Sequence, residues 1–265
     1  MIGSVVHPRN PVLLLVLAWA CACAAPDSQS HWGRHFDGQT WTGALSAQTE
    51  SADQLVPALA LLGATAWAVV DDRNLQRESR EGALTEGSTT KGDGVAIGLG
   101  VLGSGLALGE LIGGDGGHAL EVLLESAVLV DGVTEILKHT VRRDRPGDSS
   151  PDSFPSGHTS FAFTMATCLA RGVDDLGDGW YDKLGYLAYI PAAYVGIDRS
   201  EANKHWPSDV AFGAFLGLFL TNVVYDAHHG TPRHGGIYSQ PDRSRWSLEP
   251  SVDEHGTRLE LVLRF

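Results

Sequence analysis

The stretch from 138 to 209 contains three short polar clusters: KHTVRRDRP at 138–146, PSGH at 155–158 and DRSEANKHWPSD at 198–209. Each cluster lies beside an apolar run of helical length, so we expect the clusters to sit at helix ends. Together they supply fixed cations, two histidines and a carboxylate, which are the groups needed to transfer a phosphoryl group. Each cluster alone has an ordinary structural interpretation, as a basic helix end, a turn or a surface ion pair, so the prediction depends on their coincidence.

Cations in the first and third clusters fit the oxygens of a phosphoryl group. Lys138, Arg145 and Arg199 suit this task because negative charge spreads over three oxygens during transfer, and arginine can bind two of them at once. The Ser156 hydroxyl and the Gly157 backbone N–H add donors at the start of a predicted helix, whose N-terminus attracts anions. The sequence has no Walker-type glycine loop, so a nucleotide-driven motor is not expected.

Two histidines divide the predicted chemistry. Pro207 suits the first turn of a helix, which places His205 at the helix mouth and Asp209 about one turn inside. This spacing predicts that the Asp209 carboxylate holds one ring nitrogen of His205, so that the other nitrogen can attack phosphorus. His158 of the second cluster is predicted to protonate the leaving oxygen.

The order Lys-x6-Arg-Pro, Pro-Ser-Gly-His and Arg-x5-His-x3-Asp resembles the signature of the type 2 phosphatidic acid phosphatase superfamily, which includes bacterial class A acid phosphatases and vanadium haloperoxidases. The resemblance covers about residues 95–227. It implies phosphate ligands at Lys138, Arg145, Ser156, Gly157 and Arg199, a general acid at His158, a phosphohistidine nucleophile at His205 and its orienter at Asp209. The third motif usually opens with Ser-Arg, whereas this chain has Asp198-Arg199. Asp198 is expected either to pair with a cation of the pocket or to be solvated.

Composition and charge restrict the class of protein. The 265 residues are 43% hydrophobic and carry a formal net charge of −13, which fits one globular domain and argues against nucleic acid as a partner. Residues 1–24 have the basic start, apolar run and small residues of a signal peptide, so export to the periplasm or cell envelope is predicted. An uncleaved membrane anchor and lipid attachment at Cys21 remain open alternatives.

The apolar blocks predict an all-α fold with six helices, and alternating residues at the end of the chain predict a short C-terminal β-hairpin. The resemblance implies that the helices form a six-helix bundle core of the phosphatidic acid phosphatase/haloperoxidase type. The helices are expected at about 52–70, 93–112, 117–140, 157–172, 180–197 and 207–227. Residues 71–92 are expected to form a charged break between the first two helices. Acidic residues recur in several helices, which favours a water-exposed bundle. A membrane-embedded bundle remains open, because the apolar blocks approach the length that a bilayer requires.

Five parts make up the predicted domain organisation. They are a signal peptide at 1–24, an N-terminal arm at 25–51, a helical phosphatase domain at 52–227, a linker at 228–244 and a β-hairpin tail at 245–265. Alternating apolar residues in the tail predict that the hairpin packs one face on the bundle. Several histidines of the arm and linker are expected to be solvated rather than metal ligands, because neither segment holds a complete ligand set. These are His31, His35, His228, His229 and His234.

These features predict an exported, metal-independent phosphatase that hydrolyses phosphate monoesters through a phosphohistidine. The partner would be a phosphorylated small molecule or a lipid, and no cofactor is expected. Two alternatives remain: a vanadate-dependent haloperoxidase that holds vanadate on His205, and a non-catalytic exported binding module. Phosphatase turnover without metal, halide oxidation only with vanadate, or neither activity would separate the three.

Overall fold

The computed structural model describes residues 35, 37–82, 89–113, 118–147, 150–175, 182–230, 246–253 and 256–263. The predicted signal peptide and the lipidation candidate Cys21 lie outside these residues. The described helices and strands, in chain order, are α3 (Gly38–Glu50), α4 (Ala52–Glu81), α5 (Thr89–Gly113), α6 (His118–Val141), α7 (Gly157–Asp174), the 3-10 helix η1 (Asp182–Ala188), α8 (Tyr189–Glu201), α9 (Pro207–His229), β1 (Trp246–Asp253) and β2 (Gly256–Leu263). All six predicted core helices are present, the fifth as η1 followed by α8, which confirms the all-α fold.

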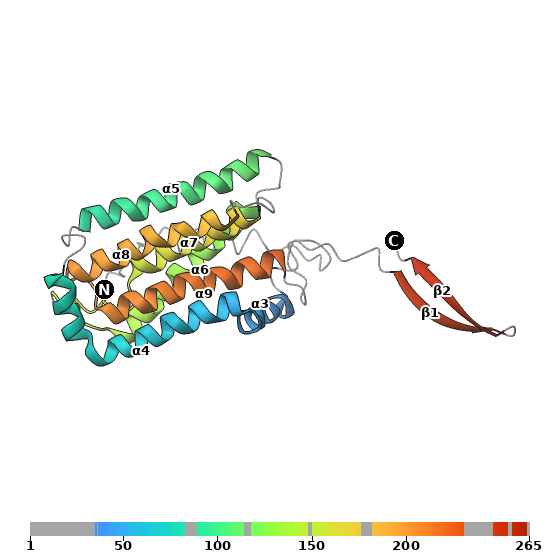
Figure 1. Cartoon of the computed structure of the whole chain (residues 1–265), viewed down its shortest axis with the longest axis horizontal. Coiled ribbons are helices and arrows are strands. Elements are labelled where there is room, and N and C mark those ends of the chain that lie inside the picture. The colour runs from blue at the N-terminus through green and yellow to red at the C-terminus, as the bar shows by residue number, and fades with distance from the viewer. Residues whose placement is uncertain are drawn as a thin grey trace, which may run out of the picture.

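The long helices lie side by side in a bundle (Figure 1). Helix α7 is central, since it packs against α5, α6, α8 and α9. Its residues Ala162 and Ala166 are fully buried. Apolar side chains of four helices form the core around them: Leu99, Leu123, Met165 and Val195. Removal of these side chains from water is the main force that holds the bundle together.

Two glycines let α9 approach the start of α7 closely. A Cβ atom at Gly213 would lie 2.7 Å from the Ser156 carbonyl oxygen, and one at Gly217 would clash with the Ser160 carbonyl oxygen. A side chain at either position would push the two helices apart. The glycines therefore hold the PSGH turn against the first turns of α9.

The first core helix is longer than predicted. Helix α4 continues to Glu81, so most of the charged break expected at 71–92 is helical. The backbone leaves helical geometry at Asp71 (φ −131°, ψ 25°), where α4 is kinked. Beyond the kink, Asp72 and Gln76 stand one turn apart and are buried. Both form hydrogen bonds to residues just before or at the start of α9. This buried polar face explains why a charged sequence folds as a helix here.

Part of the predicted N-terminal arm is a helix, α3, which was not among the helices expected from the sequence. Asp37 caps the N-terminus of α3, since its carboxylate accepts a hydrogen bond from the Gln39 N–H at 3.0 Å. Ala44 and Ala47 of α3 are buried, and Ala44 packs in a cluster with apolar residues of α9. The sequence of the arm has no periodic run of large apolar residues, so it gave no indication of a helix. In the structure, α3 packs closely on α9 through small residues.

The C-terminal strands β1 and β2 pair in antiparallel fashion, with Trp246 opposite Leu263 and Asp253 opposite Gly256. The predicted packing of this hairpin on the bundle concerns side chains outside the described residues, and it stays a prediction. The boundary of the predicted linker was wrong, because α9 continues through His229.

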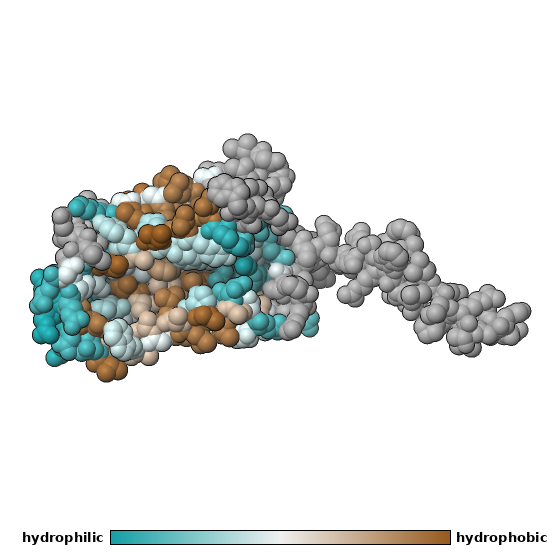
Figure 2. Space-filling model, in the orientation of Figure 1, coloured by the Kyte–Doolittle hydropathy of each residue, from teal (hydrophilic) through white to brown (hydrophobic). Residues whose placement is uncertain are grey.

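Large apolar side chains are exposed on the outside of the bundle (Figure 2). On α4 they include Val56, Trp67 and Val70, whose exposed fractions are 62%, 65% and 86%. By length and hydropathy, α4 and α9 are each able to cross a membrane; 17% of the apolar stretch is buried in α4 and 67% in α9. The value for α9 fits a core helix, so α4 carries the stronger indication. This exposed surface favours the membrane-associated alternative over the water-exposed bundle.

Candidate active site

The three polar clusters meet at one end of the bundle. Lys138 lies in the last turn of α6, Gly157 begins α7, and Arg199 lies in the last turn of α8. His205 lies between α8 and α9, and Asp209 lies in the first turn of α9. A Cβ atom at Gly157 would lie 3.3 Å from Lys138 Nζ, so the first two clusters are in contact. A backbone hydrogen bond of 3.1 Å between the N-cap of α7 and Asp209 joins the second cluster to the third.

His205 is buried, and its ring has a fixed orientation. Its Nδ1 lies 2.6 Å from the backbone carbonyl oxygen of Ser153. A carbonyl oxygen only accepts hydrogen bonds, so Nδ1 carries the proton and Nε2 keeps its lone pair. Burial lowers the pKa of His205 to about 3, and the positive charges of Arg145 and Lys138 act in the same direction. The ring is therefore neutral at neutral pH, as a nucleophile must be.

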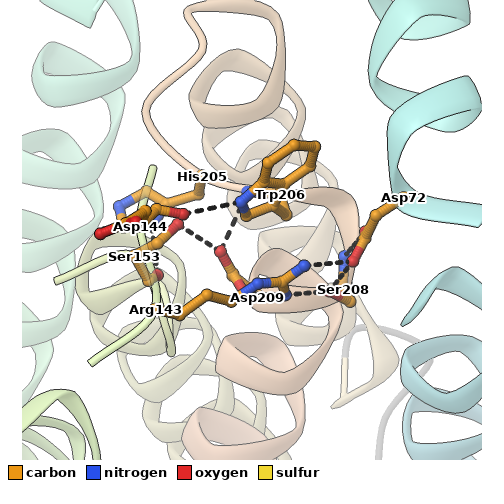
Figure 3. A network of polar contacts seen from close by, with 8 residues as sticks. All are labelled: Asp72, Arg143, Asp144, Ser153, His205, Trp206, Ser208 and Asp209. Carbon is orange, nitrogen blue, oxygen red and sulfur yellow. Dashed lines mark hydrogen bonds and ion pairs between the residues drawn. The ribbon is translucent and has the colours of Figure 1, made fainter. Parts of the chain in front are cut away.

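Asp209 does not hold the His205 ring directly, which corrects the prediction. Its carboxylate accepts hydrogen bonds from the Ser153 hydroxyl and from the Trp206 N–H, the latter at 3.0 Å (Figure 3). Ser153 connects the two residues, since its hydroxyl binds Asp209 and its carbonyl binds His205. The spacing within the third cluster placed Asp209 near His205 but gave no sign of Ser153, which comes from the segment before PSGH.

Arg143 and Asp72 complete a buried network that the sequence did not reveal (Figure 3). The two terminal nitrogens of Arg143 bind different carboxylates: Nη1 lies 2.6 Å from Asp209 and Nη2 lies 2.7 Å from Asp72. Asp72 also accepts a hydrogen bond from the Ser208 N–H at 3.0 Å, which ties α4 to the first turn of α9. Arg143 belongs to a basic run and Asp72 to the predicted charged break, so their sequence contexts resemble those of solvated charges.

His158 and Arg199 share a carboxylate, Asp93, that was not predicted. The Oδ1 atom of Asp93 lies 3.1 Å from His158 Nε2 and 3.0 Å from Arg199 Nη2. Burial lowers the pKa of His158, the Arg199 charge lowers it further, and Asp93 opposes both effects. Asp93 stands near the start of α5, a glycine-rich apolar helix, and no motif in the sequence connects it to the three clusters.

Each predicted phosphate-binding cation has a carboxylate beside it. Lys138 Nζ lies 2.6 Å from the Glu135 carboxylate. Arg145 binds Asp152 through Nε and Nη2, each at 2.9 Å. Such pairs hold the cations in place, and an incoming phosphate would compete with the carboxylates for the same donors.

Asp198 pairs with a cation of the site, which was the first of the two predicted alternatives. Its side chain is buried, and its Oδ2 lies 3.1 Å from Arg199 Nη2. Helix α5 packs closely against this pair, because a Cβ atom at Gly92 would lie 2.9 Å from Arg199 Nη2. The replacement of the usual serine by Asp198 therefore adds a carboxylate beside a predicted phosphate ligand.

The two PSGH residues predicted to bind phosphate differ in exposure. Ser156 is the N-cap residue of α7 and is buried, and its hydroxyl lies 2.9 Å from that of Thr159. Gly157 is the first residue of α7, where the backbone N–H is directed out of the helix N-terminus. The Gly157 N–H therefore stays a candidate phosphate donor, whereas the Ser156 hydroxyl is turned into the protein.

A buried neutral imidazole, a second histidine and paired cations make this end of the helical bundle a candidate anion site centred on a histidine. Residues 119–233 match the family model of the PAP2 superfamily. The match begins in α6 and extends just past α9, so it includes all three polar clusters.

Several curated proteins are similar to parts of this chain. Lipid A 1-phosphatase of Porphyromonas gingivalis is 35% identical over 97 residues, which are 37% of this chain and 21% of that protein. The probable diacylglycerol pyrophosphate phosphatase 1 of Schizosaccharomyces pombe is 34% identical over 80 residues, which are 28% of this chain and 29% of that protein. The chain thus spans less than a third of the length of these relatives. Among solved structures, Aquifex aeolicus LpxE aligns over 58% of this chain and 93% of its own, with 24% identity and a TM-score of 0.45.

Proposed function

We propose that this protein is a membrane-associated phosphatase of the cell envelope that hydrolyses lipid phosphate monoesters through a phosphohistidine on His205. The observation that carries the proposal is the buried His205 ring, whose Nδ1 is 2.6 Å from the Ser153 carbonyl. That contact leaves Nε2 as the nucleophile among fixed cations. The relatives named as lipid phosphatases support the substrate class. The apolar start of the chain supports export.

The first step transfers the phosphoryl group to the protein. Lys138, Arg145 and Arg199 bind the phosphoryl oxygens and stabilise their charge. His205 Nε2 attacks phosphorus, the bond to the leaving oxygen breaks, and His158 gives its Nε2 proton to that oxygen. Before substrate binds, His158 Nε2 lies 3.1 Å from the Asp93 carboxylate.

The second step releases phosphate. The neutral His158 takes a proton from a water molecule, and the resulting hydroxide attacks the phosphohistidine. The P–N bond breaks, inorganic phosphate leaves, and His205 returns to its neutral form. Lysine and arginine supply the positive charge throughout, so the proposed chemistry uses no metal ion at this site.

A basic groove beside the site supports a substrate with a charged headgroup. Arg73, Arg77 and Arg80 lie on one face of α4 and, with Trp206, line a hollow of about 470 Å³. Pro146 and Asn203 also line it, so the basic groove lies beside the first and third polar clusters. The first half of α4 exposes apolar side chains such as Trp67. One helix thus offers an apolar surface for acyl chains and arginines for an anionic headgroup.

Phosphate release from phosphatidic acid in mixed micelles, compared with a soluble aryl phosphate, tests the proposal. The wild-type protein should act on the lipid without added metal, and His205→Asn should be slower by roughly 10³-fold or more. His139→Asn serves as the matched control, because His139 is an exposed histidine of α6. A ³²P-labelled substrate should leave an acid-labile, base-stable label on the wild-type protein and none on His205→Asn.

Inhibitors separate the proposed mechanism from its alternatives. Vanadate should inhibit because it mimics five-coordinate phosphorus, whereas a chelator should leave turnover intact. Full activity of His205→Asn, or a requirement for a divalent ion in turnover, would overturn the proposal. Halide oxidation in the presence of vanadate, without phosphate release, would instead identify the haloperoxidase alternative.

A further inference from the structure

Four ionisable side chains meet at the end of the bundle opposite to the proposed nucleophile. Glu121 and Glu125 stand one turn apart near the start of α6, His228 lies in the last turn of α9, and His35 precedes α3. We call these four residues the far-end cluster. About 30 Å of α9 separate this cluster from the catalytic end, at a rise of about 1.5 Å per residue.

The Glu125 carboxylate faces both imidazole rings of the far-end cluster. His228 Nε2 lies 2.6 Å from its Oε2, and His35 Nδ1 lies 3.2 Å from its Oε1. One potential ligand atom from each of these three residues lies within 4.8 Å of the others. Donor atoms bound to one zinc ion at about 2.0–2.2 Å stand roughly 3.3 Å apart in tetrahedral geometry, so a small adjustment would bring all three onto one ion.

Glu121 occupies the position of a carboxylate that orients a metal-binding histidine. Its Oε1 lies 3.0 Å from His35 Nε2, the ring nitrogen that does not face Glu125. A histidine that binds a metal through one nitrogen donates a hydrogen bond from the other, and a carboxylate is a common acceptor. The cluster therefore offers three inner ligands, with a fourth position open to water, and an outer carboxylate.

Charge balance also favours a cation in the far-end cluster. The side chains of His35 and His228 are fully buried, and that of Glu125 is 9% exposed. The carboxylates of Glu121 and Glu125 therefore lie beside imidazole nitrogens in a largely buried cluster, where a divalent cation would offset their negative charge.

We propose that His35, Glu125 and His228 bind one zinc ion, with Glu121 as a positioning residue for His35. The zinc fastens the segment before α3 to α6 and α9, far from the proposed chemistry. From the sequence, both histidines are expected to be solvated, because neither of their two segments holds a complete set of metal ligands. The fold corrects this, because α9 continues through His228 and α3 packs on α9, which brings the arm to the end of the bundle.

Metal analysis of the full-length chain, purified with a histidine-free tag, tests the proposal. The wild-type protein should contain one zinc ion per chain, and His35→Ala, Glu125→Gln and His228→Ala should contain none. Glu121→Gln should still bind zinc, but roughly 10–100-fold more weakly. His229→Ala is the matched control: it removes the adjacent imidazole, whose ring stacks on Tyr225 outside the zinc site, and it should keep the metal.

A stability measurement on the wild-type chain keeps the test informative if the variants do not fold. Removal of zinc by a chelator should lower the Tm by roughly 5–10 °C, and added zinc should restore it, since an ion at about a hundredfold its Kd stabilises the folded state. Phosphatase turnover at low temperature should not change, so failure here is distinct from failure of the proposed function. No stoichiometric zinc in the wild type, equal zinc in His228→Ala, or an unchanged Tm after chelation would each overturn the zinc site.

Discussion

At the scale of single residues, the hydrogen bond between His205 and the Ser153 carbonyl gives the segment before PSGH a part in orienting the proposed nucleophile. Ser153→Ala keeps this carbonyl but removes the hydroxyl that binds Asp209. We expect kcat to fall roughly tenfold to a hundredfold with KM little changed, because a buried hydrogen bond to a charged group is worth about 1.5–3 kcal/mol. Steady-state kinetics measure this effect. Thr140→Ala, which removes an exposed hydroxyl of α6, should have wild-type kinetics. Unchanged kcat in Ser153→Ala would show that Asp209 acts without this relay.

The proposed acid, His158, gives the enzyme a pH dependence that Asp93 controls. Burial and the Arg199 charge hold the His158 pKa below its ordinary value of about 6.5. An acid must carry its proton, so kcat/KM should fall as the pH rises through this lowered pKa. Asp93 raises the pKa, and Asp93→Asn should therefore move the fall to lower pH. Rate profiles with a lipid phosphate measure the shift, and an aryl phosphate with a good leaving group should show a weaker fall. A shift to higher pH in Asp93→Asn would contradict the assignment.

Asp198 would oppose the charge of a phosphate bound at the proposed site, because it is buried and its Oδ2 lies 3.1 Å from Arg199 Nη2. Asp198→Ser removes this negative charge and restores the residue usual in the motif. We expect vanadate to bind more tightly, while turnover falls because Arg199 loses a partner that holds it in place. Vanadate inhibition and turnover across pH measure both effects. Equal values for the variant and the wild type would show that the carboxylate has no influence on the pocket.

Residues within the three motifs could be identified from the sequence because each motif is a continuous segment with a recognisable spacing. The residues that complete the site could not, because their partners are distant along the chain. Asp72 accepts from Ser208, 136 positions later, and His205 binds Ser153, 52 positions earlier. Spacing on one helix predicted a direct contact between Asp209 and His205. In the structure, Ser153 from a distant segment connects the two residues instead.

At the scale of elements, the charged half of α4 is fixed by a polar anchor rather than by an apolar face. Asp72→Asn should weaken the contacts to Arg143 and Ser208, and we expect the free energy of unfolding to fall by about 2–3 kcal/mol, less than for a fully buried pair because Arg143 is 28% exposed. Asp71→Asn is the matched control, since Asp71 is exposed and accepts a hydrogen bond from Asn74 of the same helix. Chemical denaturation measures both variants. Equal stability of the two would show that α4 does not depend on this anchor.

The positions of the helices were easier to predict from the sequence than the residues at which they end, and the Asp72 contacts of α4 show why. Apolar periodicity locates the six core segments, because each must bury a face against α7 or its neighbours. The end of α4 depends instead on Asp72 and Gln76, whose partners lie near α9. Helix α3 depends on small residues such as Ala44 and on the cap at Asp37, which are weak signals in a polar segment.

At the scale of the whole molecule, the exposed apolar surface and the position of the proposed site together indicate how the bundle would be oriented in a membrane. The apolar half of α4 is exposed, and its basic half, beyond the kink at Asp71, lines the basic groove at the catalytic end. Apolar side chains belong among acyl chains, and arginines belong at the level of anionic headgroups. The proposed site would then open at the membrane surface, where a lipid phosphate presents its headgroup.

This orientation predicts that Trp67 lies among acyl chains. Its side chain is 65% exposed on the apolar half of α4, whereas Trp41 is partly buried and its indole N–H donates to the His35 carbonyl at 2.8 Å. Vesicles of brominated phospholipid quench tryptophans that enter the hydrocarbon region, so wild-type fluorescence should fall when the protein binds them. Trp67→Phe should lose a large part of the quenchable emission, and Trp41→Phe should lose little. A water-exposed bundle would give no quenching in any of the three proteins, and the lipid-facing assignment of α4 would then be wrong. Equal losses in the two variants would show instead that the bundle meets the bilayer through another surface.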